Sequence, residues 1–479
     1  MGRGPPDAIV ECSRASSSEA ARGDVFRVMP CRAFVASALL AALLILEPAV
    51  RAQGSGASTS EALSSWFAER VGEWRQLVFF GKLPQLNDAD AAAATRRIED
   101  RLSELRTRFP LQSLDADGVV LFRCYENLAR LQVGEIAWRE QVAPFFRTVL
   151  PSAVAPTQLP VGYYEHLVAS STTAALTAGE VRALGERELA RIHQDLRGVM
   201  AALGQSGSMR HFFDYLRTDD RFFYPGTDEG REAYLTDTRR IVAEMQSRLD
   251  ELVIDPPNAP LDVRRLGGTS ESEALPMYVR GGTYLIPMAD MHAVPRYLLQ
   301  GIAYHEGLPG HHLQFSIQQG APGGKGSLAA DHCQSSGYTE GWGFYAERLP
   351  YELGLYADSY ANAGRLGLEA WRAARAIVDV RVNVDGWSDE RALAFLMDNT
   401  PLPEALARID VGRFRVSPGL TTAYLIGKLA IERQRARAAA ALGPKFDIRV
   451  FHDQVLRHGP MPLAAIEDLV ERWIQSASR

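Results

Sequence analysis

Residues 304–312 read YHEGLPGHH and place three of the ten histidines of the chain around one glutamate. The segment is a stretched form of the HExxH pattern. In that pattern two imidazoles one helical turn apart bind Zn²⁺, and the glutamate beside the first deprotonates a water molecule. Here the second histidine comes two or three residues late. The segment therefore predicts a metal site built on a modified helix.

The delay rules out a regular helix. On such a helix His311 would lie about 9 Å along the axis from His305 and point about 120° away. His312 would return to nearly the same face but lie roughly 10.5 Å away, whereas the donor atoms of two zinc ligands are at most about 4 Å apart. Pro309 has no amide to donate to the carbonyl of His305, and Gly310 tolerates unusual backbone angles. We expect the helix to bulge here, with two residues looped out and His311 as the second ligand, while His312 stays the alternative ligand.

The helix that carries the first histidine is predicted to start near Pro295, because proline favours the first turn. Leu298, Ile302 and His305 then fall on one face, which places His305 at the end of a buried stripe. The simpler interpretation is a group of surface or core histidines around a helix break.

A third ligand is expected from the segment GYTEGWGFYAE, residues 337–347. Glu340 follows His311 by 29 residues, which allows a loop through the glycine-rich residues 320–326 and a return helix. Glu347 lies two turns further on the same face and could orient a ligand histidine. The alternative is two solvated acids on an amphipathic helix, but the aromatic residues beside them indicate a buried setting.

Three segments together carry a resemblance: HEGLPGHHLQ (305–314), EGWGFYAE (340–347) and RFRVSPGLTTAYLIG (413–427). They resemble the bacterial domain-of-unknown-function 885 family, whose zincin-like members are usually described as metallopeptidase candidates. The resemblance spans most of the chain after the N-terminal segment. It implies a mainly α, helical zincin-like metallopeptidase fold with Zn²⁺ as its cofactor. His305, His311 and Glu340 would be the metal ligands and Glu306 the general base.

The third segment departs from the family pattern at Leu420, where a glutamine is common. A hydrolase of this kind needs a donor for the developing oxyanion, and Tyr424 or Arg413 could supply it through a phenol or a guanidinium group. The alternative is that Tyr424 packs in a helix that begins near Thr421, while Arg413 pairs with a surface acid.

The N-terminal residues 1–52 are predicted to be an upstream extension followed by a signal peptide. The run from Phe34 to Val50 is apolar, follows Arg32, and ends near a small residue suited to cleavage, Ala52. Met29 could be the true start. An uncleaved membrane anchor is the alternative, although the run falls short of the ~20 residues that cross a bilayer. We therefore expect an exported protein, periplasmic or extracellular.

The remaining composition fits a folded enzyme, with 46% hydrophobic and 23% charged residues. A net charge of -6 with interspersed signs argues against nucleic acid as a partner, since such proteins carry a basic patch or stripe. Cys124 and Cys333 remain after the signal segment and, in an oxidising compartment, could form one disulfide or stay as two buried thiols. The oligomeric state is not indicated.

Helical periodicity dominates the chain, as in Leu189, Ile192, Leu196 and Met200. Prolines at 256–260 suggest a division into an N-terminal helical lobe, 53–260, and a C-terminal helical lobe, 261–479, that holds the metal site beside a cleft. The runs 277–280 and 283–286 predict a small β-hairpin before the metal helix, whose edge could pair with an extended peptide. Residues 323–327, GGKGS, predict a flexible loop that could act as a lid.

Three functional classes fit these features. The first is a zinc peptidase that acts on a peptide or small amide through a metal-activated water. The second is a zinc amidase or esterase with a non-peptide substrate, which would share every catalytic residue. The third is a non-catalytic helical binding protein with a lapsed site. The first agrees best with the motifs.

Overall fold

The computed structural model describes residues 58–78, 86–140, 158–268, 271, 274–320, 327–356 and 358–478. Side chains are described for all of these residues except 72–78. The predicted signal segment and start codon lie outside these residues, as do the four glycine-rich positions 323–326 of the predicted lid.

Helices make up most of the described chain, so the expectation of a mainly α fold is confirmed. The N-terminal half contains α2 (Thr59–Val78), α3 (Asp88–Arg108), α4 (Ala116–Ala137), α6 (Val161–Thr172), α7 (Ala178–Ala202), α8 (Met209–Thr218) and α9 (Asp228–Gln246). The C-terminal half contains α10 (Arg296–Glu306), α11 (His311–Gly320), α12 (Leu328–His332), α13 (Ser336–Ala346), α14 (Leu349–Glu352), α15 (Ser359–Asn383), α16 (Asp389–Asn399), α17 (Glu404–Val416), α18 (Ala423–Leu442), α19 (Ile448–Leu456) and α20 (Leu463–Ala477). In the described residues, no helix is both long and apolar enough to cross a membrane.

Local sequence explains the clearest of these helices. A capping box starts α7: the Thr177 side chain accepts from the Glu180 amide, and the Glu180 carboxylate accepts from the Thr177 amide. Leu189, Ile192 and Leu196 then recur at spacings of three and four residues and are all buried. The predicted stripe is therefore confirmed.

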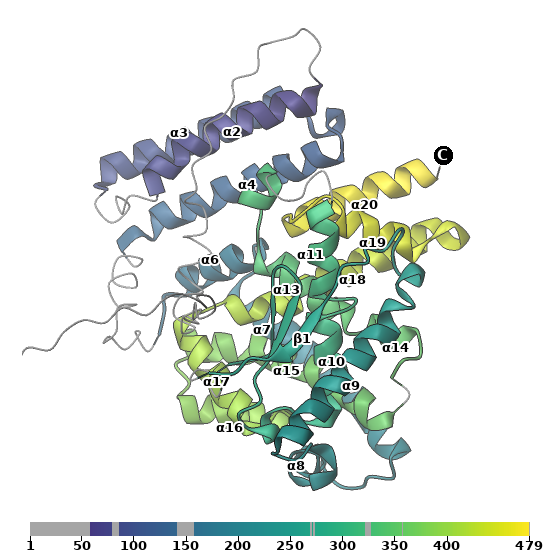
Figure 1. Ribbon diagram of the computed structural model, residues 1–479. Coiled ribbons are helices and arrows are strands. Elements are labelled where there is room, and N and C mark those ends of the chain that lie inside the picture. Colours follow the sequence, from purple (N-terminus) through teal and green to yellow (C-terminus); the bar gives the residue numbers. More distant parts are fainter. Residues whose placement is uncertain are drawn as a thin grey trace, which may run out of the picture.

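Helix α15 is the centre of the C-terminal half. Nearly all of its residues are buried, and it packs against α7 and α10. Figure 1 shows α15 in the body of the molecule, whereas α2, α3 and α4 lie together at one end. The largest buried apolar cluster runs from Leu63 to Val470 and so includes residues on both sides of 256–260. The division into two lobes with a cleft stays a prediction.

Three short strands form one sheet in the order β1-β3-β2. The antiparallel pair of β2 (Met277–Val279) and β3 (Thr283–Ile286) is the predicted hairpin. The sequence did not predict β1 (Asp262–Arg265), which pairs with β3 in parallel and contacts α9. Because β2 has no partner on its outer side in the described sheet, it is an edge strand close to the end of α10.

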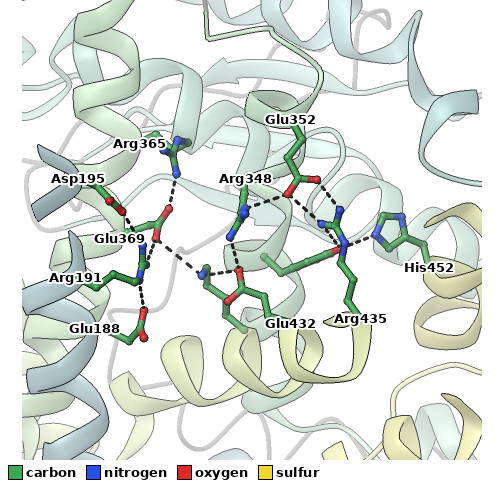
Figure 2. Close-up of polar contacts among 12 residues, drawn as sticks. Glu188, Arg191, Asp195, Arg348, Glu352, Arg365, Glu369, Glu432, Arg435 and His452 are labelled. Carbon is green, nitrogen blue, oxygen red and sulfur yellow. Dashed lines mark hydrogen bonds and ion pairs between the residues drawn. The ribbon is translucent and has the colours of Figure 1, made fainter. Parts of the chain in front are cut away.

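A network of ion pairs, some buried and some exposed, joins the helices around α15 (Figure 2). The Glu369 carboxylate, only 5% exposed, lies 3.0 Å from the Arg191 guanidinium of α7 and 3.9 Å from the Lys428 ammonium of α18, and it also pairs with Arg365. Burial alone would raise the pKa of Glu369, but these three cations outweigh it and lower the pKa to about 2.

The network continues along α18 toward the C-terminal helices. Lys428 lies 2.8 Å from Glu432, and Arg348 bridges Glu432 to Glu352 at 3.5 and 3.0 Å. Arg435 then reaches Glu352 at 2.7 Å. Figure 2 follows this chain of contacts from α7 to α19. The network therefore connects α7, α15 and α18 with the segment around α14 and with α19.

Cys124 and Cys333 form a disulfide, which decides between the two states that the sequence left open. The bond joins α4 to the C-terminal end of α12 across 209 residues of sequence. It ties the N-terminal helices to the segment that leads into α13.

Candidate metal centre

The YHEGLPGHH segment spans two helices rather than one bulged helix. Helix α10 ends at Glu306, and α11 begins at His311. The His312 amide donates to the Gly307 carbonyl, a bond one residue longer than the α-helical spacing. The expectation of a continuous helix with two residues looped out is therefore wrong. Pro309 cannot continue the ladder, so the chain ends one helix and starts another.

Two contacts hold the link between these helices. The indole N–H of Trp342 donates to the carbonyls of Pro309 and Gly310, at 3.1 and 3.3 Å. A side-chain carbon at Gly310 would lie 1.9 Å from the His305 carbonyl oxygen, so only glycine fits. The link thus packs against α13, the helix that supplies Glu340.

His305, His311 and Glu340 come together, with one ligand atom of each within 4.8 Å of the others. The Nε2 atoms of His305 and His311 lie 3.4 and 3.5 Å from the Oε2 atom of Glu340. Ligands about 2.05 Å from a tetrahedral zinc ion have donor atoms about 3.3 Å apart. The spacing of these atoms therefore fits a zinc ion.

Gly343 makes room for both imidazoles. A side-chain carbon at this position would lie 2.8 Å from His305 Cε1 and 2.9 Å from His311 Cε1. Carbon atoms in favourable contact are about 3.5–4.0 Å apart. The absence of a side chain on α13, one turn after Glu340, is thus what lets the two rings approach its carboxylate.

The Nδ1 atom of each histidine, which points away from Glu340, has its own hydrogen-bond partner. His305 Nδ1 lies 2.8 Å from Glu347 Oε1, and His311 Nδ1 lies 3.3 Å from the side-chain oxygen of Gln314. Since both partners accept hydrogen bonds there, each Nδ1 carries a proton, and each Nε2 is the nitrogen that faces Glu340 and could bind a metal ion. Arg372 holds Glu347 in turn, at 3.1 Å.

The charges of the cluster favour a cation among the three donors. Burial would lower the pKa of His305, but hydrogen bonds with Glu340 and Glu347 outweigh it and raise the pKa to about 9. Burial would likewise raise the pKa of Glu340, but hydrogen bonds from both histidines hold it well below its usual range. The centre therefore favours an ionised carboxylate beside a positive charge.

Glu306 lies beside this cluster but is not one of the three grouped donors. It is 9% exposed, and its Oε2 atom accepts a hydrogen bond of 2.8 Å from the amide of Tyr278 on strand β2. Burial is the main reason why the pKa of Glu306 is raised, and the charge of Glu340 adds to it. A raised pKa suits a carboxylate that must accept and return a proton.

His312, the alternative ligand, is not brought to the three donors. Its Nε2 atom donates to the Ala259 carbonyl at 2.9 Å, so its Nδ1 atom can accept from the Tyr278 hydroxyl at 3.3 Å. Both nitrogens are engaged. His312 instead positions Tyr278, whose amide holds Glu306.

Tyr424, in the first turns of α18, stacks on His305 with ring centroids 6.0 Å apart and an angle of 23° between the rings. Burial and the charge of Glu340 raise the pKa of its hydroxyl. The pKa of Arg413, on α17, is raised by its interactions with Tyr424 and Asp410, and its guanidinium lies 3.8 Å from the buried Asp410 carboxylate. Arg413 thus pairs with a buried acid rather than with a surface one.

The charged stripe of α15 was not predicted from the sequence. Arg372 and Arg375 lie with their guanidinium groups 5.6 and 5.2 Å from the centre of the Tyr424 ring. They belong to a helical stripe of charged residues spaced by three or four positions: Arg365, Glu369, Arg372, Arg375 and Asp379. Such a stripe normally indicates a solvated face. The small and apolar residues on its other faces were the signal that this helix is buried.

Comparison with known proteins agrees with the motifs. A crystal structure described as that of a "putative lipoprotein" from Colwellia psychrerythraea matches with a TM-score of 0.64 and 25% identity, over 79% of this chain and 70% of that one. A "putative lipoprotein of unknown function" from Shewanella oneidensis shares the fold, with a TM-score of 0.57 and 18% identity, over 88% of this chain and 89% of that one. No curated protein matches. The family described as "Bacterial protein of unknown function (DUF885)" matches residues 129–470, and the chain belongs to this family.

Proposed function

We propose that this protein is an exported zinc-dependent peptidase with a helical, zincin-like active site in a cleft between two lobes. One observation carries the proposal: two imidazole nitrogens, of His305 and His311, lie 3.4 and 3.5 Å from one oxygen of Glu340. Two imidazoles and one carboxylate are a donor set that catalytic zinc uses, with a position left for water.

The residues present fit the ion. The side chain of Glu340 is 26% exposed, whereas the two histidines are buried, so the open side of the cluster lies at the carboxylate. A bound zinc ion supplies Lewis acidity, which polarises a carbonyl group and makes water nucleophilic at neutral pH.

Glu306 is the proposed general base. Its raised pKa lets it take a proton from the attacking water and return that proton to the leaving amine. The Tyr278 amide fixes one carboxylate oxygen, which leaves the other free to face the water. His312 contributes indirectly, because its hydrogen bond orients the Tyr278 ring.

Tyr424 is the proposed oxyanion donor. Arg413 interacts with this phenol and has no acceptor atom, so it does not compete for the Tyr424 hydroxyl proton. The Tyr424 O–H is then free to donate to the oxygen of a tetrahedral intermediate. Arg413 orients this group and adds positive charge beside it.

A peptide is favoured over other amides by the edge strand. β2 ends the described sheet and contacts the proposed base directly, so an extended peptide could pair with its backbone at the site. An amidase or esterase with a non-peptide substrate would use the same residues and is the alternative. Export is supported by the Cys124–Cys333 disulfide and by two structural neighbours described as lipoproteins.

The test combines metal content with turnover. Mass spectrometry of the purified protein should find about one zinc per chain, and a peptide pool should be cleaved. Glu306→Gln should keep the zinc and lose hydrolysis, whereas His311→Ala should lose both. His312→Gln is the matched control and should keep the zinc, since both nitrogens of His312 are engaged elsewhere. A wild-type protein without zinc after supplementation would refute the proposal.

A further inference from the structure

Arg280 is an exposed cation directly after the edge strand β2. Its guanidinium carbon lies 4.5 Å from the centre of the Phe315 ring on α11, and its Nη2 atom donates to the side-chain oxygen of Gln334 at 3.1 Å. An aromatic ring on one side and a hydrogen bond on another give the guanidinium group a defined place, although solvent still reaches it. Arg280 is thus a positioned surface cation.

The charge of Arg280 is not matched by an acid. Among the residues that the structure describes, no carboxylate lies within 4.0 Å of its guanidinium nitrogens. Partial desolvation lowers the pKa of Arg280, whereas Arg191, which faces several carboxylates, has a raised pKa. The guanidinium group is therefore available to an anionic ligand.

Phe315 places this cation beside the candidate metal centre. Its ring lies 5.9 Å from the ring of His311 and stacks on that of Tyr278, 5.6 Å away at an angle of 6°. The amide of Tyr278 holds Glu306. The contacts of Phe315 with Arg280 and His311 put the guanidinium carbon at most about 10 Å from the middle of the His311 ring, which about three residues of extended peptide span.

The edge strand offers a substrate a path past this cation. Strand β2 ends at Val279, and Arg280 is the next residue. A peptide that pairs with the outer side of β2 would run from the Tyr278 position, beside the proposed base, toward Arg280. Arg280 would then face a substrate residue close to the bond at the centre.

We propose that Arg280 binds an acidic side chain of the peptide substrate, within about three residues of the cleaved bond. The inference rests on the proposed function and adds a substrate class, peptides with aspartate or glutamate near that bond. Arginine suits this role because its planar fork meets a carboxylate with two hydrogen bonds. The selection is local, since the net charge of -6 does not attract acidic peptides at long range.

The first experiment starts from the peptide that the wild type cleaves best in a pool, made with an acetylated N-terminus and an amidated C-terminus. Each position within about three residues of the cleaved bond carries glutamate or glutamine in turn. At one position or more, the wild type should cleave the glutamate form about 5- to 10-fold faster in kcat/KM, the effect of one ion pair at a partly exposed site. Added salt should reduce this preference. Equal rates at every position would overturn the proposal and leave the peptidase function intact.

Variants of Arg280 assign the preference to this residue. Arg280→Gln should remove the preference, Arg280→Lys should keep part of it, and Arg280→Glu should favour lysine at the same position instead. Arg97→Gln is the matched control: it removes an exposed arginine of α3, at one end of the molecule (Figure 1), and should keep the preference. A preference for glutamate that survives Arg280→Gln would refute the assignment. So would a preference that arises equally when the glutamine peptide carries a free C-terminal carboxylate.

A binding experiment separates this inference from the proposed function. Fluorescence anisotropy with the Glu306→Gln variant should give about fivefold tighter binding of a labelled peptide amide of alternating alanine and glutamate than of its alanine and glutamine counterpart. Adding Arg280→Gln to this variant should remove the difference. If the wild type cleaves no peptide, the peptidase proposal fails, and this difference still decides whether Arg280 binds acidic side chains. Equal binding of the two peptides would refute that role.

Discussion

Replacement of Gly343 by alanine tests the geometry of the candidate centre most directly. The new methyl group would lie 2.8 Å from His305 Cε1, 2.9 Å from His305 Nε2 and 2.9 Å from His311 Cε1. Favourable contacts begin near 3.5 Å, so each ring must retreat by roughly 0.6 Å. Metal–ligand distances tolerate only about 0.2 Å.

The rings have little freedom to make that movement in concert. His305 is held by Glu347 on one side and stacks on Tyr424 on another, and both histidines are buried. Loss of a group that merely orients a ligand weakens metal binding about 10- to 100-fold. Displacing two ligands should cost at least 100-fold in zinc affinity, or about 3 kcal/mol.

Alanine favours the helix over glycine by up to about 1 kcal/mol, so α13 itself should remain formed. The affinity for zinc can be measured by competition with a chelator, with circular dichroism and thermal unfolding of the zinc-free protein as checks on folding. Gly198→Ala is the matched control: Gly198 is an exposed glycine of α7 with no atom within 4 Å of the added carbon. That variant should bind zinc like the wild type.

An unchanged zinc affinity in a folded Gly343→Ala protein would refute this reasoning. It would mean that the two imidazoles do not approach α13 in the zinc-bound state, and hence that Glu340 is not the third ligand. A global loss of structure in the zinc-free variant would instead mean that the clash is relieved by displacing α13.

Three further predictions concern stability and the support of the centre. Replacing Cys124 and Cys333 by alanine should lower the free energy of unfolding by up to about 5 kcal/mol, because the disulfide closes a loop of 209 residues. Urea unfolding measures this change, and an unchanged midpoint would show that the bond is not formed. Glu369→Gln should cost about 3 kcal/mol at pH 7, because the folded pKa of about 2 lies below the ordinary 4.5. A lowered pKa stabilises the fold above pH 4.5, and this stabilisation is lost as the pH falls toward 2. The difference in unfolding free energy between wild type and variant should therefore shrink over that range. A constant difference would contradict the ion-pair origin. Glu347→Ala should weaken zinc binding about 10- to 100-fold by releasing the His305 ring, whereas zinc titrations that match the wild type would show that the carboxylate does not orient this ligand.

Local patterns predicted the parts of the fold that depend on short-range interactions. The capping box at Thr177 and the apolar stripe that follows it specify α7, and the Gly-Gly turn between two β-branched or aromatic runs specifies the hairpin of β2 and β3. Strand β1 escaped prediction, because its pairing with β3 is a contact between distant segments and leaves no local signal. The disulfide was undecided for the same reason, since the 209 residues between its cysteines carry no information about their distance in space.

At the candidate metal centre, the motif predicts which residues are ligands but not the path of the chain between them. Zinc binds histidine, cysteine and carboxylate side chains, and the motifs contain histidines and glutamates, so the sequence named the three residues that meet. Spacing alone could not choose between His311 and His312. The choice depends on how the chain passes Pro309 and Gly310, and that path is set by Trp342 on another helix. A continuous helix was the wrong expectation because the backbone of the segment alone does not determine this path. The same limit applies to Arg413, because the sequence does not show that its nearest acid, Asp410, is buried.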